Sequence, residues 1–313
     1  MFIIQEEKNK WVKYGALFAI AIMVGSAVLV GILGSWDKIT GDKDGLTEHS
    51  FSDISGKHMN FTFKNAKDAA KILPENILAI NIVKIYADDS YYQSIQSSFP
   101  GANISKMLSA SYADGGLELF VIEDESNAGI VLNTSKPQIE TYENYSLIFI
   151  NPYQKVVVGN PILISTVYDY TAGNTLAKKT IDVLSGKSEG STGLNDILAY
   201  ADDVSNYDEI VVFKANTGSS YEKYYQRSSQ SVNMTSFQID LQFESILLNP
   251  SDEMKQDLSD LSQNASDGIK FTITEESNIM KIYVEGADYT GFLNDTNALY
   301  KIVSNHTKQA ATA

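Results

Sequence analysis

The sequence predicts an α+β protein in which one N-terminal transmembrane helix is followed by two tandem, duplicated α+β units with mainly antiparallel sheets. Three observations lead to this prediction. Residues 14–36 carry no charge. Beyond them, helix-like and strand-like segments alternate irregularly with hairpin turns, which favours an antiparallel sheet over a doubly wound parallel one. Short motifs also recur at an offset of 132 to 134 residues, as expected of a duplicated unit.

The uncharged stretch 14–36 has the length and flanks of a membrane-spanning helix. As a helix it rises by about 34 Å, enough to cross a hydrocarbon layer about 30 Å thick. Trp11, Tyr14 and Trp36 stand where interfacial aromatic residues are expected. A cleaved secretory signal has a much shorter apolar core, of about 7–15 residues. We therefore expect a signal anchor that is retained.

A stripe of small residues runs along this helix at four-residue spacing. Its members are Gly15, Ala19, Ala27, Gly31 and Ser35, with Met23 interrupting the series. Small residues on one helix face allow close packing against a second membrane helix. The alternative is that glycine and alanine are simply common in membrane helices.

Flanking charges and glycosylation acceptors predict the orientation of the anchor. Lys8, Lys10 and Lys13 precede it, whereas Lys38 and Lys43 follow, so the positive-inside rule places residues 1–13 in the cytoplasm. Eight Asn-x-Ser/Thr acceptors all follow the helix, about twice as many as the composition predicts. They are Asn60, Asn103, Asn133, Asn144, Asn233, Asn264, Asn294 and Asn305. N-glycosylation at these sites would place the C-terminal bulk outside the cytoplasm.

Charge and cysteine content narrow the class of protein. A net charge of −15 disfavours nucleic acid as a partner, because phosphate binding needs clustered basic residues. The chain has no cysteine, so no disulfide can form, and its only arginine is Arg227. Acceptor sites without disulfides, together with abundant Ile, Asn and Tyr, resemble archaeal single-pass surface glycoproteins. This resemblance of composition implies a short cytoplasmic tip, one anchor and a large acidic ectodomain on the cell surface.

Composition also divides the chain after the anchor. Residues 37–58 are polar and glycine-containing, which predicts a flexible spacer, and residues 185–193 (SGKSEGSTG) predict a linker. The two α+β units then occupy residues 59–184 and 194–304, with a tail at 305–313.

Four weak matches between the two halves support the duplication. Strand-like segments 77–83 and 209–213 begin 132 residues apart, and 146–150 and 280–284 begin 134 apart. Tyr91-Tyr92-Gln93 recurs as Tyr224-Tyr225-Gln226, and each half opens with a helix-like segment, 65–72 or 194–201. Each unit is therefore predicted as helix, strand, tyrosine-bearing helix, hairpin strands and closing helix.

The later elements of each half follow from turn and capping patterns. Hairpins are predicted for 116–123 with 129–132, and for 268–274 with 279–285. Asn160 followed by Pro161 predicts the start of a closing helix in the first half, and a second helical piece follows from residue 174. The helix at 289–304 closes the second half.

No sequence motif supports an enzyme, a cofactor or a metal site. The histidines His49, His58 and His306 fall in the predicted spacer, at its edge and in the tail, where an imidazole is not expected to be held rigidly. Tyr221, Tyr224, Tyr225 and Arg227 form a candidate partner-binding patch, or alternatively one packed face of the tyrosine-bearing helix.

The sequence therefore favours a non-catalytic, membrane-anchored surface glycoprotein with a structural, envelope or assembly role. Its partners are expected to be the membrane and other envelope proteins or copies of itself. A second interpretation is a pilin-like filament subunit, because Lys13-Tyr14-Gly15-Ala16 before an apolar helix resembles an archaeal prepilin processing site. Tyr14 departs from that pattern, which usually has a charge there. A third is an enzyme acting on envelope polysaccharide. The carboxylate pairs Asp88-Asp89 and Asp202-Asp203 suit glycoside hydrolysis or calcium binding, although adjacent Asp residues in a loop are usually solvated turn formers.

Overall fold

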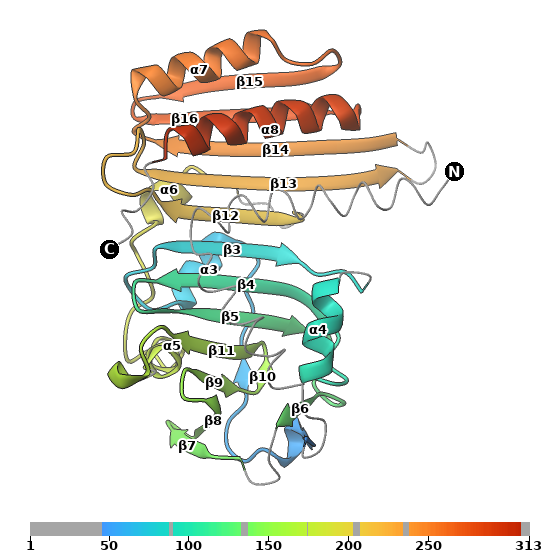
Figure 1. Cartoon of the computed structure of the whole chain (residues 1–313), viewed down its shortest axis with the longest axis vertical. Helices are drawn as coiled ribbons and strands as arrows, with labels where there is room; N and C mark the ends of the chain where they lie inside the picture. The colour runs from blue at the N-terminus through green and yellow to red at the C-terminus, as the bar shows by residue number, and fades with distance from the viewer. Residues whose placement is uncertain are drawn as a thin grey trace. The chain divides into compact units, whose positions relative to one another are not determined.

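The computed structural model describes residues 46–87, 90–132, 137–173, 175–202, 207–233 and 238–307. The predicted cytoplasmic tip, membrane helix and small-residue stripe lie outside these ranges. Within them, no helix is both long and apolar enough to cross a membrane. The described chain forms two compact units that meet in sequence between Val212 and Phe213. Both combine helices with antiparallel sheet, which confirms the predicted mixture and strand direction (Figure 1).

The first unit is built on an antiparallel sheet in the order β3-β4-β5-β11-β9-β8-β7. Its strands are β3 (Ala79–Lys84), β4 (Ile104–Tyr112), β5 (Gly115–Ile122), β7 (Ile139–Tyr142), β8 (Tyr145–Asn151), β9 (Gln154–Val157) and β11 (Ile162–Val167). The central strands β5 and β11 are buried at nearly every position. Both faces of the sheet centre are therefore covered, as near-continuous apolar runs require.

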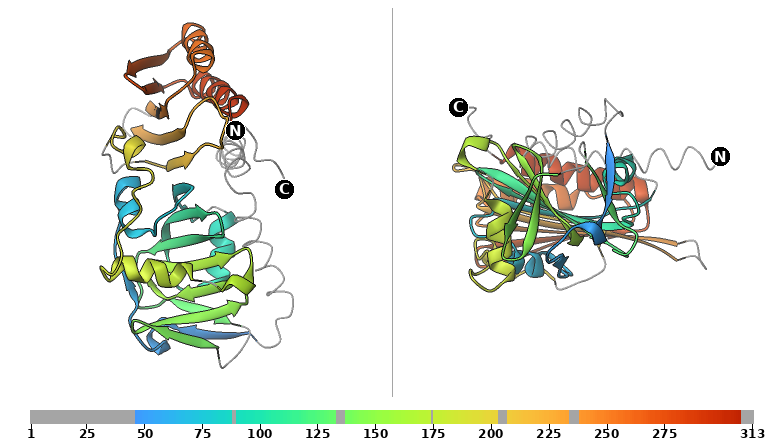
Figure 2. Two further views of the ribbon diagram at one scale, coloured as in Figure 1. Left: turned by 90° about the vertical axis from the view of Figure 1, so that its left-hand side faces the viewer. Right: turned by 90° about the horizontal axis from the view of Figure 1, so that it is seen from below.

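Helices lie on both sides of this sheet. α3 (Ala66–Ile72) and α4 (Ser90–Ser98) lie on opposite sides, as Figure 2 shows. α3 is capped by Asn65, whose side chain accepts from the Asp68 N–H at 3.0 Å, and it contacts α5 (Leu176–Leu184) and α6 (Asn195–Leu198). On the α4 side, Ile95 and Phe99 pack into a core with Phe120 of β5.

Residues 46–58 belong to this unit, although the sequence predicted a flexible spacer through residue 58. β1 (Thr47–Ser50) pairs antiparallel with β6 (Gly129–Leu132), and the 3-10 turn η1 (Phe51–Asp53) follows. Phe51 and Ile54 are buried in the core beneath α4. The pairing of β6 with β1 also shows that the hairpin predicted from 116–123 and 129–132 is wrong, since β5 pairs with β4 and β11 instead.

The closing helix predicted to start at Asn160 and Pro161 is also wrong. Residues 162–167 form β11, which is hydrogen-bonded to β5 on one side and β9 on the other. Gly159–Asn160 is the short strand β10, paired in parallel with β2 (Met59–Asn60). Every residue of β11 is buried, and its β-branched residues suit a central strand better than a helix with one exposed face. The second helical piece is confirmed as α5.

The linker-like residues 185–193 pack within the first unit. The Ser191 N–H donates to the carbonyls of Ala70 and Leu73, at 2.9 Å each. A Cβ added to Gly190 would lie 2.1 Å from the Lys71 carbonyl oxygen. The absence of a side chain at Gly190 lets the segment dock on α3, which composition alone does not reveal. The chain then continues through α6 and β12 (Glu209–Lys214), and the boundary between units falls within β12.

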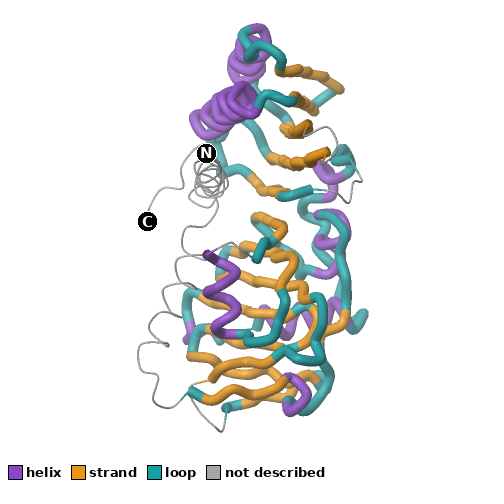
Figure 3. The backbone as a smooth tube through the Cα atoms, turned by 90° about the vertical axis from the view of Figure 1, so that its right-hand side faces the viewer, coloured by secondary structure: helices purple, strands orange, loops and turns teal. Residues whose placement is uncertain are grey.

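The second unit is an antiparallel sheet in the order β15-β16-β14-β13 with two helices on one side, as Figure 3 shows. The strands are β13 (Lys223–Asn233), β14 (Gln238–Leu248), β15 (Ile269–Glu276) and β16 (Ile279–Gly286); the helices are α7 (Asp252–Gln263) and α8 (Tyr289–Asn305). The predicted hairpin 268–285 is confirmed by the β15–β16 pairing, and the predicted closing helix by α8. Asp288 caps α8 by accepting from the N–H groups of Thr290 and Gly291.

The tyrosine motifs occupy different kinds of element in the two halves. Tyr91-Tyr92-Gln93 lies in helix α4, whereas Tyr224-Tyr225-Gln226 lies in strand β13. The tyrosine-bearing helix predicted for the second half is therefore wrong. Tyr224 and Tyr225 suit a strand, and the segment pairs along its whole length with β14, which favours a long strand over a helix.

Candidate functional site

The predicted glycosylation asparagines lie on the surface wherever the structure describes their side chains. Asn60, Asn103, Asn144, Asn264, Asn294 and Asn305 are all exposed, while the side chains of Asn133 and Asn233 lie outside the described part. They are distributed over both units, in strands, turns and helix α8. Asparagines outside the acceptor patterns vary: Asn65 is buried as a helix cap, Asn81, Asn151 and Asn160 are half-buried, and others such as Asn127 and Asn297 are exposed. The acceptor positions therefore meet the accessibility that glycan attachment requires.

The candidate partner patch is not a surface patch. Tyr221, Tyr224, Tyr225 and Arg227 are 1–7% exposed. Tyr224 and Tyr225 are neighbours in β13, so their side chains point to opposite faces of the sheet and cannot form one surface. Tyr221 and Tyr224 pack with Phe213 in an aromatic cluster. The strand conformation explains why this group contributes to the core of the second unit.

The histidines are held more firmly than their sequence positions suggested. His49 lies half-buried in β1. His58 and His306 each have hydrogen-bond partners at both ring nitrogens. The expectation that these segments could not fix an imidazole is therefore wrong for His58 and His306, because residues 46–58 and the end of α8 are folded.

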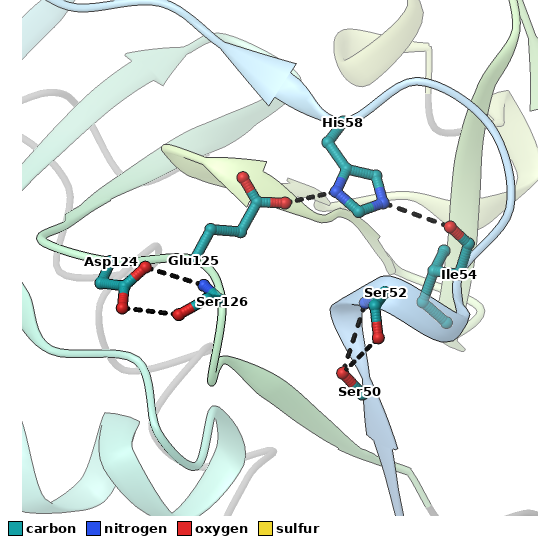
Figure 4. Close-up of polar contacts among 7 residues, drawn as sticks. All are labelled: Ser50, Ser52, Ile54, His58, Asp124, Glu125 and Ser126. Carbon is teal, nitrogen blue, oxygen red and sulfur yellow. Dashed lines mark hydrogen bonds and ion pairs between the residues drawn. The ribbon is translucent and has the colours of Figure 1, made fainter.

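His58 joins the N-terminal strap of the first unit, residues 46–58, to the loop after β5 (Figure 4). Its Nδ1 contacts a carboxylate oxygen of Glu125, and its Nε2 lies 3.2 Å from the Ile54 carbonyl oxygen. The loop is itself braced by Asp124, which accepts from Ser126 N–H at 2.9 Å and Ser126 Oγ at 2.6 Å. The two partners of the ring are a carboxylate oxygen and a carbonyl oxygen, which are both hydrogen-bond acceptors. His58 therefore holds the strap against the loop after β5, an arrangement that we call a structural clamp, and neither ring nitrogen faces a hydroxyl group.

Glu125→Gln is expected to loosen this strap. The variant keeps the side-chain shape but removes the charge that contacts His58, so local opening of residues 51–54 should become easier by about 1 kcal/mol. Hydrogen exchange at the Phe51 and Ile54 amides, which donate to Ala128 O and Phe51 O, should accelerate roughly five-fold. Glu123→Gln removes a similar exposed carboxylate two residues away and serves as the control. Equal exchange rates in the two variants would rule out the clamp.

A row of polar residues crosses the centre of the first sheet. Asn81 on β3, Ser109 on β4 and Glu118 on β5 are direct register neighbours. Glu118 is 1% exposed, and neither of its carboxyl oxygens has a hydrogen-bond partner among the described residues. Asn81 Oδ1 and Ser109 Oγ are likewise unpartnered there. Burial raises the pKa of Glu118 to about 8, so this carboxyl is mostly neutral at pH 7.

The sequence did contain a signal for this row. Glu118 is one acidic residue within the otherwise apolar run GGLELFVI, where a half-exposed strand would show regular alternation.

The row has no candidate nucleophile activated by a base. Among the described residues, no group of three or more His, Cys, Asp or Glu is placed to hold a metal ion.

Comparisons with known proteins give little further information. No protein-family model matches the chain, and no curated protein matches it. Among solved structures, crystal form III of TP0453 is similar with a TM-score of 0.42 and 6% sequence identity. The match covers 72% of this chain and 96% of that chain. A similarity of this strength does not transfer a function.

Proposed function

We propose that this protein is a membrane-anchored extracytoplasmic glycoprotein with a structural, envelope or assembly role. In this proposal residues 14–36 span the membrane, the N-terminus is cytoplasmic, and both folded units project outward. The observation that supports it best is the exposure of all six acceptor asparagines whose side chains are described. An acidic surface with a net charge of −15 suits a domain that stays solvated beside an anionic membrane.

We also infer that the two halves descend from one duplicated α+β unit. Each half opens with a short helix followed by a strand, α3 with β3 and α6 with β12. Each half also ends on a helix, α5 or α8, that packs on its own sheet. The duplication and the compact units are different divisions of the chain, because α6 and most of β12 contact the first unit.

Native protein is expected to exceed its sequence mass of 34.5 kDa by several glycans. Replacing one occupied acceptor, Asn294→Gln, should lower the intact mass by one glycan. Asn297→Gln is the matched control, because Asn297 is also exposed on α8 but is not followed by an acceptor pattern. Intact mass spectrometry of protein from native membranes checks both variants.

Two outcomes would overturn parts of this proposal. An unmodified native mass would remove the main support for the outward orientation. An N-terminal peptide that starts at Ala16 rather than Met1 would show processing within the anchor and would favour the pilin-like filament subunit instead.

A further inference from the structure

Three side chains of the second unit form a hydrogen-bonded chain from a carboxylate to a serine hydroxyl. His306 Nε2 lies 2.9 Å from Asp257 Oδ2, and His306 Nδ1 lies 3.0 Å from Ser220 Oγ. Asp257 comes from α7, His306 caps the C-terminus of α8, and Ser220 lies in the loop before β13. The three are separated by 37 and 49 residues in sequence, so only the fold brings them together.

The hydrogen bonds fix the direction in which protons are donated. An ionised Asp257 can only accept, so His306 Nε2 must carry the hydrogen in this contact. In the neutral imidazole Nδ1 then has the lone pair, and the Ser220 hydroxyl donates to it. A serine whose hydroxyl donates to a base oriented by a carboxylate is the arrangement that activates serine nucleophiles.

The backbone around the histidine holds this geometry in place. The His306 side chain is 10% exposed, and the backbone N–H of His306 donates to the Ile302 carbonyl at 3.1 Å. The Ser220 N–H donates to the His306 carbonyl at 2.9 Å, and the Ser251 N–H donates to the Ser220 carbonyl at 2.7 Å. Serine and histidine are thus joined through both backbone and side chain, so their relative position is constrained.

Ser220 also lines a shallow hollow that is open to solvent. The hollow has a volume of about 580 Å³ and is formed by residues 214–223 with Asn249 and Ser251. Its charged residues are Lys214, Glu222 and Lys223. A serine at the wall of a hollow, with an imidazole hydrogen-bonded to its hydroxyl, provides the nucleophile and the base of acyl transfer.

We propose that Ser220 is a nucleophile that accepts an acyl group from a small carboxylic ester bound in this hollow. Ser220 Oγ forms a bond to the ester carbonyl carbon while its proton passes to His306 Nδ1. The bond from that carbon to the alcohol oxygen breaks, and the alcohol leaves with the proton from His306. Water then attacks the acyl-serine with His306 again as the base, which releases the acid and restores the Ser220 hydroxyl. Asp257 is a positioning residue for the imidazole.

The alternative explanation is a purely structural clamp on the end of α8. In the serine protease triad the ring is turned the other way, with Nε2 facing the serine. Either nitrogen of a neutral imidazole can act as the base, so this difference does not exclude the reaction. His58 provides an internal comparison, because it also contacts a carboxylate but presents its other nitrogen to a carbonyl.

The test is covalent labelling of the full-length protein in detergent with an alkyl fluorophosphonate. This probe forms a serine–phosphorus bond and releases fluoride, and peptide mass mapping identifies the labelled residue. We expect the label on Ser220, none on Ser220→Ala, and a rate about 10²–10⁴-fold lower for His306→Gln. Ser219→Ala and His58→Asn should label like the wild type.

Labelling of the wild type decides the proposal even if a variant fails to fold. A wild-type protein that stays unlabelled at Ser220, or that labels Ser220 equally after heat denaturation, would leave only the structural clamp. A circular dichroism melt of His306→Gln shows whether its slower labelling reflects chemistry or unfolding; a rate loss that accompanies unfolding overturns the assigned base role. The proposal extends the envelope role without depending on it, because the glycan and topology measurements do not involve Ser220.

Discussion

Replacing Glu118 with glutamine is expected to stabilise the first unit by about 3 kcal/mol at pH 8 and to remove most of its pH dependence between pH 5 and pH 8. Glu118 is buried without a partner among the described residues, and burial raises its pKa to about 8. Glutamine has nearly the same shape but no ionisable group. Its amide N–H groups can also donate to Asn81 Oδ1 and Ser109 Oγ, the neighbouring acceptors on β3 and β4.

The direction of the pH effect follows from proton linkage. The folded-state pKa of Glu118 lies near 8 and its unfolded value near 4.5, so the folded protein binds more protons between these two values. The stability that neutral Glu118 contributes is therefore fully present below about pH 4.5 and is lost as the pH rises through about 8. Each pKa unit corresponds to about 1.4 kcal/mol of stability. Partial relaxation of the site around the charged carboxylate lowers the expected effect of Glu118→Gln to about 3 kcal/mol.

Urea unfolding at several pH values, followed by circular dichroism, checks this prediction. Glu209 in the same unit keeps a smaller slope in the variant, because burial and nearby Asp208 raise its pKa to about 7. Glu123→Gln is the control, since Glu123 is exposed at the end of β5. Parallel pH curves for wild type and Glu118→Gln would show that the buried carboxyl does not control the stability of this unit.

Local patterns in the sequence were enough to predict many elements and one hairpin, but not the pairing of strands distant in sequence. The alternation and turn at 268–285 predicted the β15–β16 hairpin, and the apolar face at 289–304 predicted α8. Pro161 after Asn160 has the pattern of a helix start, yet the buried pairing of β11 with β5 and β9 outweighs that local preference. The folding of residues 46–58 was missed because Phe51 and Ile54 are two apolar residues in a polar segment. Their burial becomes favourable only in the folded core beneath α4, beside the pairing of β1 with β6.

Glycosylation acceptors could be predicted because they are local motifs, visible in any sequence. The sites that the fold assembles from distant residues could not. The Asp257–His306–Ser220 chain depends on the end of α8 meeting both α7 and the loop before β13, and no spacing encodes that meeting. Arg227 was noticed as the only arginine, but its burial follows from the register of β13 with β14.

Arg227→Met is expected to destabilise the second unit by about 3–5 kcal/mol. Arg227 Nε lies 3.2 Å from Glu244 Oε2, and the two side chains are 9% and 0% exposed. They are direct register partners on β13 and β14, and Tyr283 of β16 donates to the other Glu244 oxygen at 3.3 Å. Removing the guanidinium leaves the Glu244 carboxylate fully buried without this charge, which is the costly half of breaking a buried ion pair.

A double variant separates this cost from the net contribution of the pair. Arg227→Met with Glu244→Leu removes both charges and fills the space with apolar atoms, so its stability should return to within about 1 kcal/mol of wild type or exceed it. Lys270→Met is the control, because Lys270 and Glu285 form an exposed pair, 72% and 44% exposed, expected to contribute less than about 1 kcal/mol. Hydrogen exchange at the β13 and β14 amides reports the unfolding free energy of this unit alone. If Arg227→Met cost no more than Lys270→Met, Glu244 would be solvated or neutral in the folded protein, and the buried ion pair would not hold these strands together.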